Sequence, residues 1–216
     1  MLGSTIQTQE VVHPTSTFEI YPRCLRQLEY FNDGVAQYVD IVRQSESKNK
    51  HAVYHRLFKQ ALSVSTLHVY LDASHQEGIE HAGIGACIVG SGGYTLHGTR
   101  FKTTHAIKGE LRAIEYGVKL LHSHLATQLY AQVVEVILYS DVVNVKPVKN
   151  TPVPWPFKAV DKSLRLIAVD VVVAFEQLRK LYPNLRYNLV YLSPRSQRYN
   201  FFYRAAHRLS RYTSNC

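Results

Sequence analysis

The chain has 216 residues, of which 46% are hydrophobic and 19% charged, a composition typical of a soluble globular protein with one well-formed core and an accessory segment. Its 25 Lys and Arg residues outnumber its 16 Asp and Glu residues, which gives a net charge of +9 and an isoelectric point near 9.5. This excess fits a polyanionic partner such as nucleic acid, although a merely basic protein has the same charge.

The cysteine content and the hydropathy pattern exclude several classes of protein. Cys24, Cys87 and Cys216 are far apart and form no C-x-x-C pair, so we expect neither a disulfide framework nor a zinc site. No apolar run reaches the ~20 residues that span a bilayer, and the first residues lack the basic head and apolar core of a secretory signal. We therefore expect a cytoplasmic protein with no membrane partner.

Before residue 66 the sequence predicts a flexible start followed by a small helical segment. Residues 1–21 are polar and rich in Thr, which is typical of a flexible terminus. Apolar residues then recur every three or four positions from Pro22 to about Gln44, and again over 52–62, with a solvated linker "SESKNK" between them. The role of this helical segment, 22–65, stays open between packing on the main domain, docking a protein partner and holding nucleic acid.

Residues 66–216 predict an α/β domain with a mixed five-stranded sheet flanked by helices. Leu67, Val69 and Leu71 alternate with polar side chains, which is the period-two pattern of a strand. Further strands are predicted at 83–89, 94–102, 133–141 and 185–192. Helices are predicted at 103–125, 161–181 and 200–212. The first three strands are separated only by short turns, so they form an antiparallel meander.

Three carboxylates fall at positions where such a domain would bring them together. Asp72 closes the first strand, Asp141 closes the fourth, and Glu110 lies in the first turns of the helix between them, on its apolar face. Each acid alone is also compatible with turn chemistry or with the helix dipole. If the two strands are parallel neighbours, however, their carboxyl ends meet at the edge where α/β sheets bind ligands. A carboxylate on an apolar face is costly unless it is paired.

Carboxylates gathered in this way repel one another and favour a bound cation. Mg²⁺ prefers oxygen ligands, and one or two such ions would satisfy the three acids. Two ions about 3.5–4 Å apart can activate a water and stabilise the leaving oxygen of a phosphodiester. The acids therefore predict a magnesium-dependent site acting on phosphate esters.

Several stretches resemble the type 1 ribonuclease H family of the ribonuclease H-like superfamily. "VYLDAS" resembles the family's first strand with Asp72, and "AGIGACIV" its second strand. "TTHAIKGELRAIEYGVKLL" resembles the helix that carries the catalytic glutamate, here Glu110, and "VEVILYSDVVNVK" the strand that carries the third acid, Asp141. The resemblance implies that these three residues are catalytic metal ligands for two Mg²⁺ ions, or for Mn²⁺. It also implies hydrolysis of the RNA strand of RNA–DNA hybrids.

The final helix departs from the family pattern. "AAHRLSRY" resembles the family's last motif, but His207 stands where the fourth acid is expected. Imidazole suits transition metals better than Mg²⁺, so His207 could tolerate Mn²⁺, carry a proton or contribute nothing. Val142 stands where the family prefers serine. Two alternatives to the endonuclease therefore remain open: a weakened or inactive protein that binds nucleic acid, and a protein-interaction module.

Polar and basic side chains around these motifs are candidates for binding nucleic acid. Some precede the Glu110 helix, where family members contact the hybrid, and others lie in the proline-rich loop after Asp141 or after the last strand. A solvated surface is the alternative for the basic ones. The candidates are Thr103, Thr104, His105, Lys146, Lys149, Arg195 and Arg198.

Overall fold

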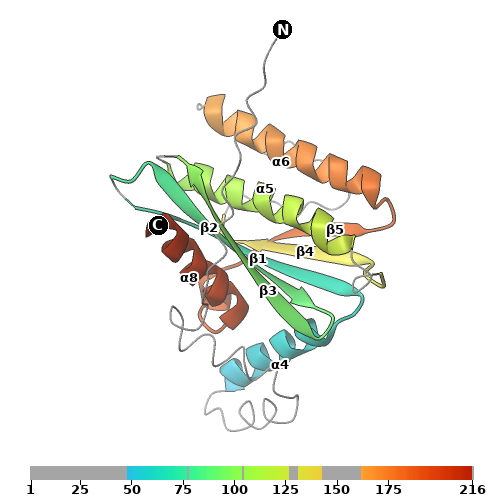
Figure 1. Ribbon diagram of the computed structural model, residues 1–216. Coiled ribbons are helices and arrows are strands. Elements are labelled where there is room, and N and C mark those ends of the chain that lie inside the picture. Colours follow the sequence, from blue (N-terminus) through green and yellow to red (C-terminus); the bar gives the residue numbers. More distant parts are fainter. Residues whose placement is uncertain (1–47, 77, 104, 127–130, 143–161, 216) are drawn as a thin grey trace.

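The computed structural model describes residues 48–215 apart from 77, 104, 127–130 and 143–161 (Figure 1). The expected flexible start and first helix, 1–44, lie outside the described residues. So do Thr104, Lys146 and Lys149 among the candidates for binding nucleic acid.

Within the described part, the chain forms five strands and five helices. The strands are β1 Thr66–His75, β2 His81–Gly90, β3 Gly93–Lys102, β4 Glu135–Ser140 and β5 Arg186–Tyr191. The helices are α4 Lys48–Leu62, α5 Ala106–Leu125, α6 Lys162–Leu181, α7 Pro194–Gln197 and α8 Phe201–Asn215. None of the helices in these residues is long and apolar enough to cross a membrane.

The strands form one mixed sheet in the order β3-β2-β1-β4-β5. β1 pairs antiparallel with β2, and β2 with β3, as expected for a meander. β1 and β5 both run parallel to β4. A parallel pair needs a crossover connection, which α5 supplies between the meander and β4 and α6 supplies between β4 and β5. The predicted α/β fold, a mixed five-stranded sheet flanked by helices, is confirmed by this topology.

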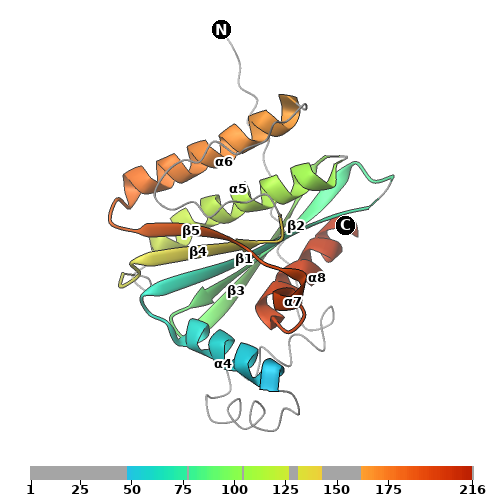
Figure 2. The same cartoon turned by 180° about the vertical axis from the view of Figure 1, so that it is seen from behind.

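Helices cover both faces of the sheet (Figures 1 and 2). α5 and α6 lie on one face, and α8 and α4 on the other. The first face holds the larger core, in which Leu67, Val69 and Leu71 of β1 pack with Leu111 and Ile114 of α5. The second core is rich in aromatic side chains. Its buried members are Tyr54, Leu57, Ala61, Tyr70, Cys87, Val89, Leu192, Phe201, Phe202, Tyr203, Ala205 and Ala206.

Helix α4 packs on the second face through apolar and polar contacts. Leu57 is fully buried in the aromatic core. The Tyr70 hydroxyl donates to Gln60 Oε1 at 2.6 Å, and Gln60 Nε2 donates to the Tyr139 hydroxyl at 3.3 Å. The Tyr70 and Tyr139 rings stack at 4.6 Å between centroids. These contacts join the helix that precedes β1 to the sheet.

Two glycines of β2 allow α8 to approach the sheet closely. A Cβ at Gly83 would lie 2.0 Å from the carbonyl oxygen of Ser210, and a Cβ at Gly85 would lie 2.0 Å from that of Ala206. Both neighbours are helix backbone, which cannot turn aside as a flexible side chain can. The spaced glycines of "AGIGACIV" therefore determine how near α8 comes to β1 and β2.

The observed elements differ from the sequence-based prediction at several points. Helix α5 begins at Ala106 and not at 103, and β4 ends at Ser140, so Asp141 follows this strand and does not close it. Helix α4 begins at Lys48, inside the stretch expected to be a linker, and the short helix α7 was not anticipated. Strand β1 continues past Asp72 to His75, because Ala73 and the next two residues still pair with β2. The expectation that Asp72 closes the strand is therefore wrong. The parallel pairing of β1 with β4 ends at Tyr70, so Asp72 lies just beyond the paired residues.

We predict that Gly85→Ala destabilises the protein, because the added methyl group would force α8 away from the sheet. Overpacking of this kind costs about 1–3 kcal/mol. Urea denaturation would show a lower midpoint, and Gly93→Ala is the matched control because a Cβ there meets no atom within 4 Å. Equal midpoints for the two variants would contradict the close approach.

Candidate metal centre

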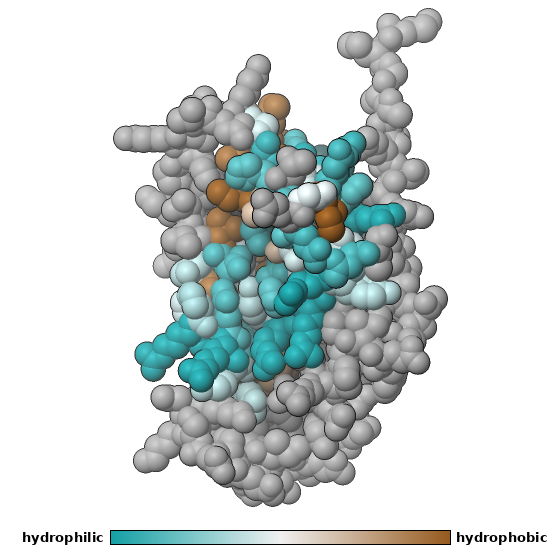
Figure 3. Space-filling view, turned by 90° about the vertical axis from the view of Figure 1, so that its left-hand side faces the viewer, coloured by the Kyte–Doolittle hydropathy of each residue, from teal (hydrophilic) through white to brown (hydrophobic). Residues whose placement is uncertain are grey.

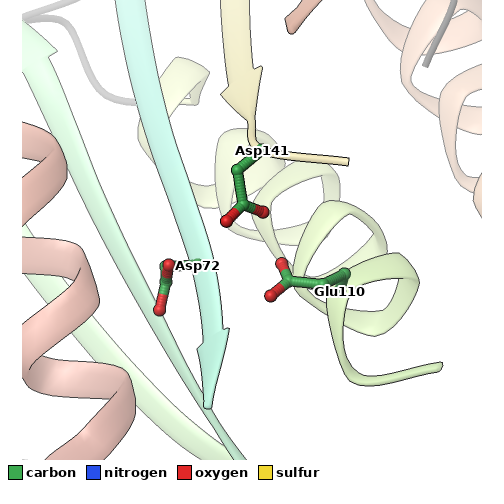
Figure 4. Close-up of side chains that lie close together, drawn as sticks. All are labelled: Asp72, Glu110 and Asp141. Carbon is green, nitrogen blue, oxygen red and sulfur yellow. The ribbon is translucent and has the colours of Figure 1, made fainter. Parts of the chain in front are cut away.

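Three carboxylates converge at the sheet edge where β1 passes beyond the end of β4 (Figure 4). Asp72 comes from β1, Asp141 follows the last residue of β4, and Glu110 comes from the second turn of α5. One oxygen of each lies within 4.8 Å of the others. Figure 4 shows Glu110 and Asp141 pointing toward each other, with Asp72 on the side of α8.

The local structure explains why these side chains meet. Parallel pairing of β1 with β4 brings the ends of the two strands to the same edge. Gly109 lets the first turns of α5 sit close to the sheet, since a Cβ there would lie 3.1 Å from that of Ala82 and 3.4 Å from that of Ala73. Glu110, the next residue, is thereby held against the end of the parallel pair.

Burial and mutual repulsion make ionisation of these acids unfavourable without a cation. Burial raises the pKa of Glu110 well above its usual value, and the charges of Asp141 and Asp72 raise it further. Burial also raises the pKa of Asp141, with the charge of Asp72 as a second cause. Ionising both carboxyls together is therefore less favourable than ionising a carboxyl in water.

One oxygen of this cluster lacks a hydrogen-bond partner among the described residues. Glu110 Oε2 is buried and receives no hydrogen bond. A buried acceptor without a donor is costly, and a cation is the group that would satisfy it next to two further carboxylates. The donor set is entirely oxygen, which suits Mg²⁺ or Mn²⁺. The residues therefore fit a divalent cation.

Helix α8 holds Asp72 from the opposite side. The carboxylate is only 2% exposed. The Tyr203 hydroxyl donates to Oδ1 at 2.8 Å, the Ser210 hydroxyl donates to Oδ2, and His207 Nδ1 lies 3.1 Å from Oδ2. Asn200 fixes the start of this helix, because its side-chain oxygen accepts the Tyr203 backbone N–H at 3.0 Å. Asp72 is thus a buried acid surrounded by donors.

Tyr203 touches a second acid as well, since its hydroxyl lies 3.1 Å from Asp141 Oδ2. Burial and the neighbouring carboxylates raise the pKa of Tyr203, so its hydroxyl keeps its proton and acts as a donor. The hydrogen bond to Asp72 raises the pKa of His207, although burial opposes this. Roughly half of the His207 side chain is exposed, at 45%, so solvent reaches the ring.

Sequence reasoning placed the three acids and His207 but missed the roles of Tyr203 and Ser210. Tyr203, His207 and Ser210 are spaced at i, i+4 and i+7, which puts three polar side chains on one face of a helix. That pattern was the available signal. It could not show the partner, because Asp72 lies 131 residues before Tyr203 in the chain.

The candidates for binding nucleic acid are only partly described. Thr103 is buried, and its hydroxyl accepts the His105 backbone N–H at 3.2 Å, so it organises the turn before α5. His105 is exposed at the N-terminus of that helix. Arg195 and Arg198 are also exposed, and the Arg198 guanidinium lies 5.3 Å from the Tyr199 ring centre. Figure 3 faces the side where β1 ends, and hydrophilic side chains gather at its centre.

No protein-family model matches the chain, and no curated protein matches it. Solved structures are similar to it in fold at low sequence identity. A ribonuclease H1 from the archaeon Halobacterium salinarum is 16% identical, with 59% of this chain and 86% of that one covered and a TM-score of 0.42. The N-terminal ribonuclease H domain of a Mycobacterium tuberculosis protein is 14% identical, with 70% and 94% covered and a TM-score of 0.46. A ribonuclease H1 isolated from compost is 17% identical, with 70% and 96% covered and a TM-score of 0.46.

We predict that Glu110 and Asp141 stabilise the metal-free protein less as the pH rises above the ordinary carboxyl range. Raised pKa values for Glu110 and Asp141 mean that the folded state binds these protons more tightly than the unfolded state. Their stabilising contribution is therefore present at low pH and lost as the two acids ionise. Glu110→Gln cannot ionise, so in chelator its urea midpoint should rise relative to that of the unsubstituted protein between pH 5 and pH 8. If the difference between the two urea midpoints does not change with pH, the proposed repulsion between Glu110 and the neighbouring acids is contradicted.

Proposed function

We propose that this protein is a metal-dependent endonuclease that hydrolyses the RNA strand of RNA–DNA hybrids. The observation that carries the proposal is the convergence of three carboxylates around a buried Glu110 oxygen without a donor. The motif resemblance supports the reaction and the hybrid substrate. The net charge of +9 supports a polyanionic partner.

Asp72, Glu110 and Asp141 would hold the cation, with Mg²⁺ as the first candidate and Mn²⁺ as the second. When bound there, a divalent cation polarises a phosphate oxygen and lowers the pKa of water. Tyr203 and Ser210 orient Asp72 by donating to its two oxygens. His207 is the half-exposed titratable group beside Asp72, so we assign it proton transfer at its ring nitrogens.

We further propose that the exposed groups around α5 and α7 contact the backbone of the nucleic acid. His105 at the N-terminus of α5, together with Arg195 and Arg198, offers donors and positive charge to phosphates. Thr103 acts indirectly, because its hydroxyl holds the turn that carries His105.

The expected outcome of a cleavage assay is metal-dependent cutting of RNA–DNA hybrid, with double-stranded RNA and single strands as comparison substrates. The products should carry 5′-phosphate and 3′-hydroxyl ends. Glu110→Gln should lower the cleavage rate by more than about 100-fold. Replacing residues that only hydrogen-bond to a metal ligand already lowers activity or metal affinity by about 10–100-fold. Glu176→Gln, which changes a half-exposed glutamate of α6 that pairs with Arg179, should keep full activity.

Tight binding of the hybrid without cleavage in either Mg²⁺ or Mn²⁺ would contradict the enzymatic proposal. That result would favour a protein that binds nucleic acid without cutting it.

We expect hybrid binding to weaken as salt rises, because neutralising phosphates releases counterions. Replacing Arg195 and Arg198 together by alanine should reduce the slope of log affinity against log salt by roughly 0.9 for each phosphate that the variant no longer neutralises. Fluorescence anisotropy of a labelled hybrid measures this slope. Lys180→Ala is the control, since Lys180 is an exposed lysine in the last turn of α6, just before β5. An equal effect of Lys180→Ala would indicate a diffuse charge effect and no specific binding of phosphate at α7.

A further inference from the structure

The hydrogen bonds to Asp72 leave this carboxylate with little remaining capacity for metal ions. An ionised carboxylate has about four lone-pair sites, two on each oxygen. Oδ2 accepts from Ser210 and faces His207 Nδ1 at 3.1 Å, while Oδ1 accepts from Tyr203 at 2.8 Å. With His207 Nδ1 in its protonated, donating form, three of the four sites are taken by α8. The remaining site, on Oδ1, is enough for one cation.

The three donors occupy one side of Asp72 as a group. They project from successive turns of α8, which is held close to the sheet at Gly83 and Gly85. The Ser210 hydroxyl also lies 2.8 Å from the His207 carbonyl oxygen, so it is fixed within its own helix. This side of Asp72 is thus occupied by side chains of α8, of which Tyr203 and Ser210 are themselves buried.

The side of Asp72 that faces α5 presents hydrogen-bond acceptors where the α8 side presents donors. It presents Glu110 Oε2, which is buried without a donor, and the carboxylate of Asp141. Among the described residues, Asp72, Glu110 and Asp141 form the one group of three or more His, Cys, Asp or Glu side chains whose ligand atoms come this close together. His207 adds no second such group, and imidazole is a poor ligand for Mg²⁺.

The geometry points to a centre that takes one divalent cation, between Asp72, Glu110 and Asp141, with the second position closed by Tyr203, His207 and Ser210. This inference rests on the proposed metal-dependent function and narrows the two ions that the motif resemblance implies to one. It assigns Tyr203 and Ser210 as positioning residues of Asp72. A second cation beside Asp72 would need ligands that offer lone pairs. Helix α8 instead presents hydrogen-bond donors there, which a cation cannot use.

The test is the stoichiometry of Mn²⁺ binding to the full chain without nucleic acid, measured by calorimetry and by the electron paramagnetic resonance signal of free Mn²⁺. We expect one ion per chain, and Glu110→Gln should weaken its binding by at least tenfold. Two ions bound to the unsubstituted protein would overturn the inference while leaving the proposed function standing. No binding at all would overturn both. A Glu110→Gln variant that binds as tightly as before would overturn the assigned position.

A pair of double variants tests which residues close the second position. Tyr203→Phe with His207→Asp removes one donor and replaces another by a carboxylate, so it should bind two ions. Tyr203→Phe with His207→Asn removes the same donor without adding an acid, so it should still bind one. Circular dichroism shows whether each variant is folded. A folded first variant that binds a single ion would contradict the role of α8 in excluding the second.

Discussion

The structure depends on keeping the Asp72 carboxylate buried on β1, the central strand of the sheet, just beyond the end of its pairing with β4. At 2% exposure, this group has lost its hydration and must be satisfied by donors or by a cation. Helix α8 supplies donors on one side, which requires close contact with β2, and the glycines at 83 and 85 allow that contact. The other side faces two more acids, and there Glu110 Oε2 is buried without a hydrogen-bond partner among the described residues. This asymmetry determines what the site can bind.

The two acids on that side are electrostatically unfavourable until a cation arrives. Burial and the nearby negative charges raise the pKa values of Glu110 and Asp141, so ionising both of them without a cation is unfavourable. Such a conflict between local stability and ligand binding is typical of functional sites. A divalent cation held by these carboxylates would offset their repulsion and favour their ionised forms.

The acids could be predicted from the sequence, while most of their surroundings could not. Alternating hydrophobicity indicated β1, and the order of strands and helices then brought Asp72, Glu110 and Asp141 to one edge because parallel strands end together. The extension of β1 to His75 was missed because "ASH" has no apolar pattern and pairs only through its backbone. The four-residue helix α7 is too short to give a periodic signal. Tyr203 and Ser210 were missed because their role depends on how α8 meets the sheet, 131 and 138 residues along the chain from Asp72.

The central claim is that Asp72, Glu110 and Asp141 together ligate a single divalent cation. Anomalous scattering from crystals of the full chain grown with Mn²⁺ and without nucleic acid tests it most directly. The account predicts one anomalous peak within about 2.0–2.4 Å of an oxygen from each of the three carboxylates, with Tyr203 and Ser210 still bonded to Asp72. A second peak between Asp72 and His207, or no peak at the three acids, would contradict it.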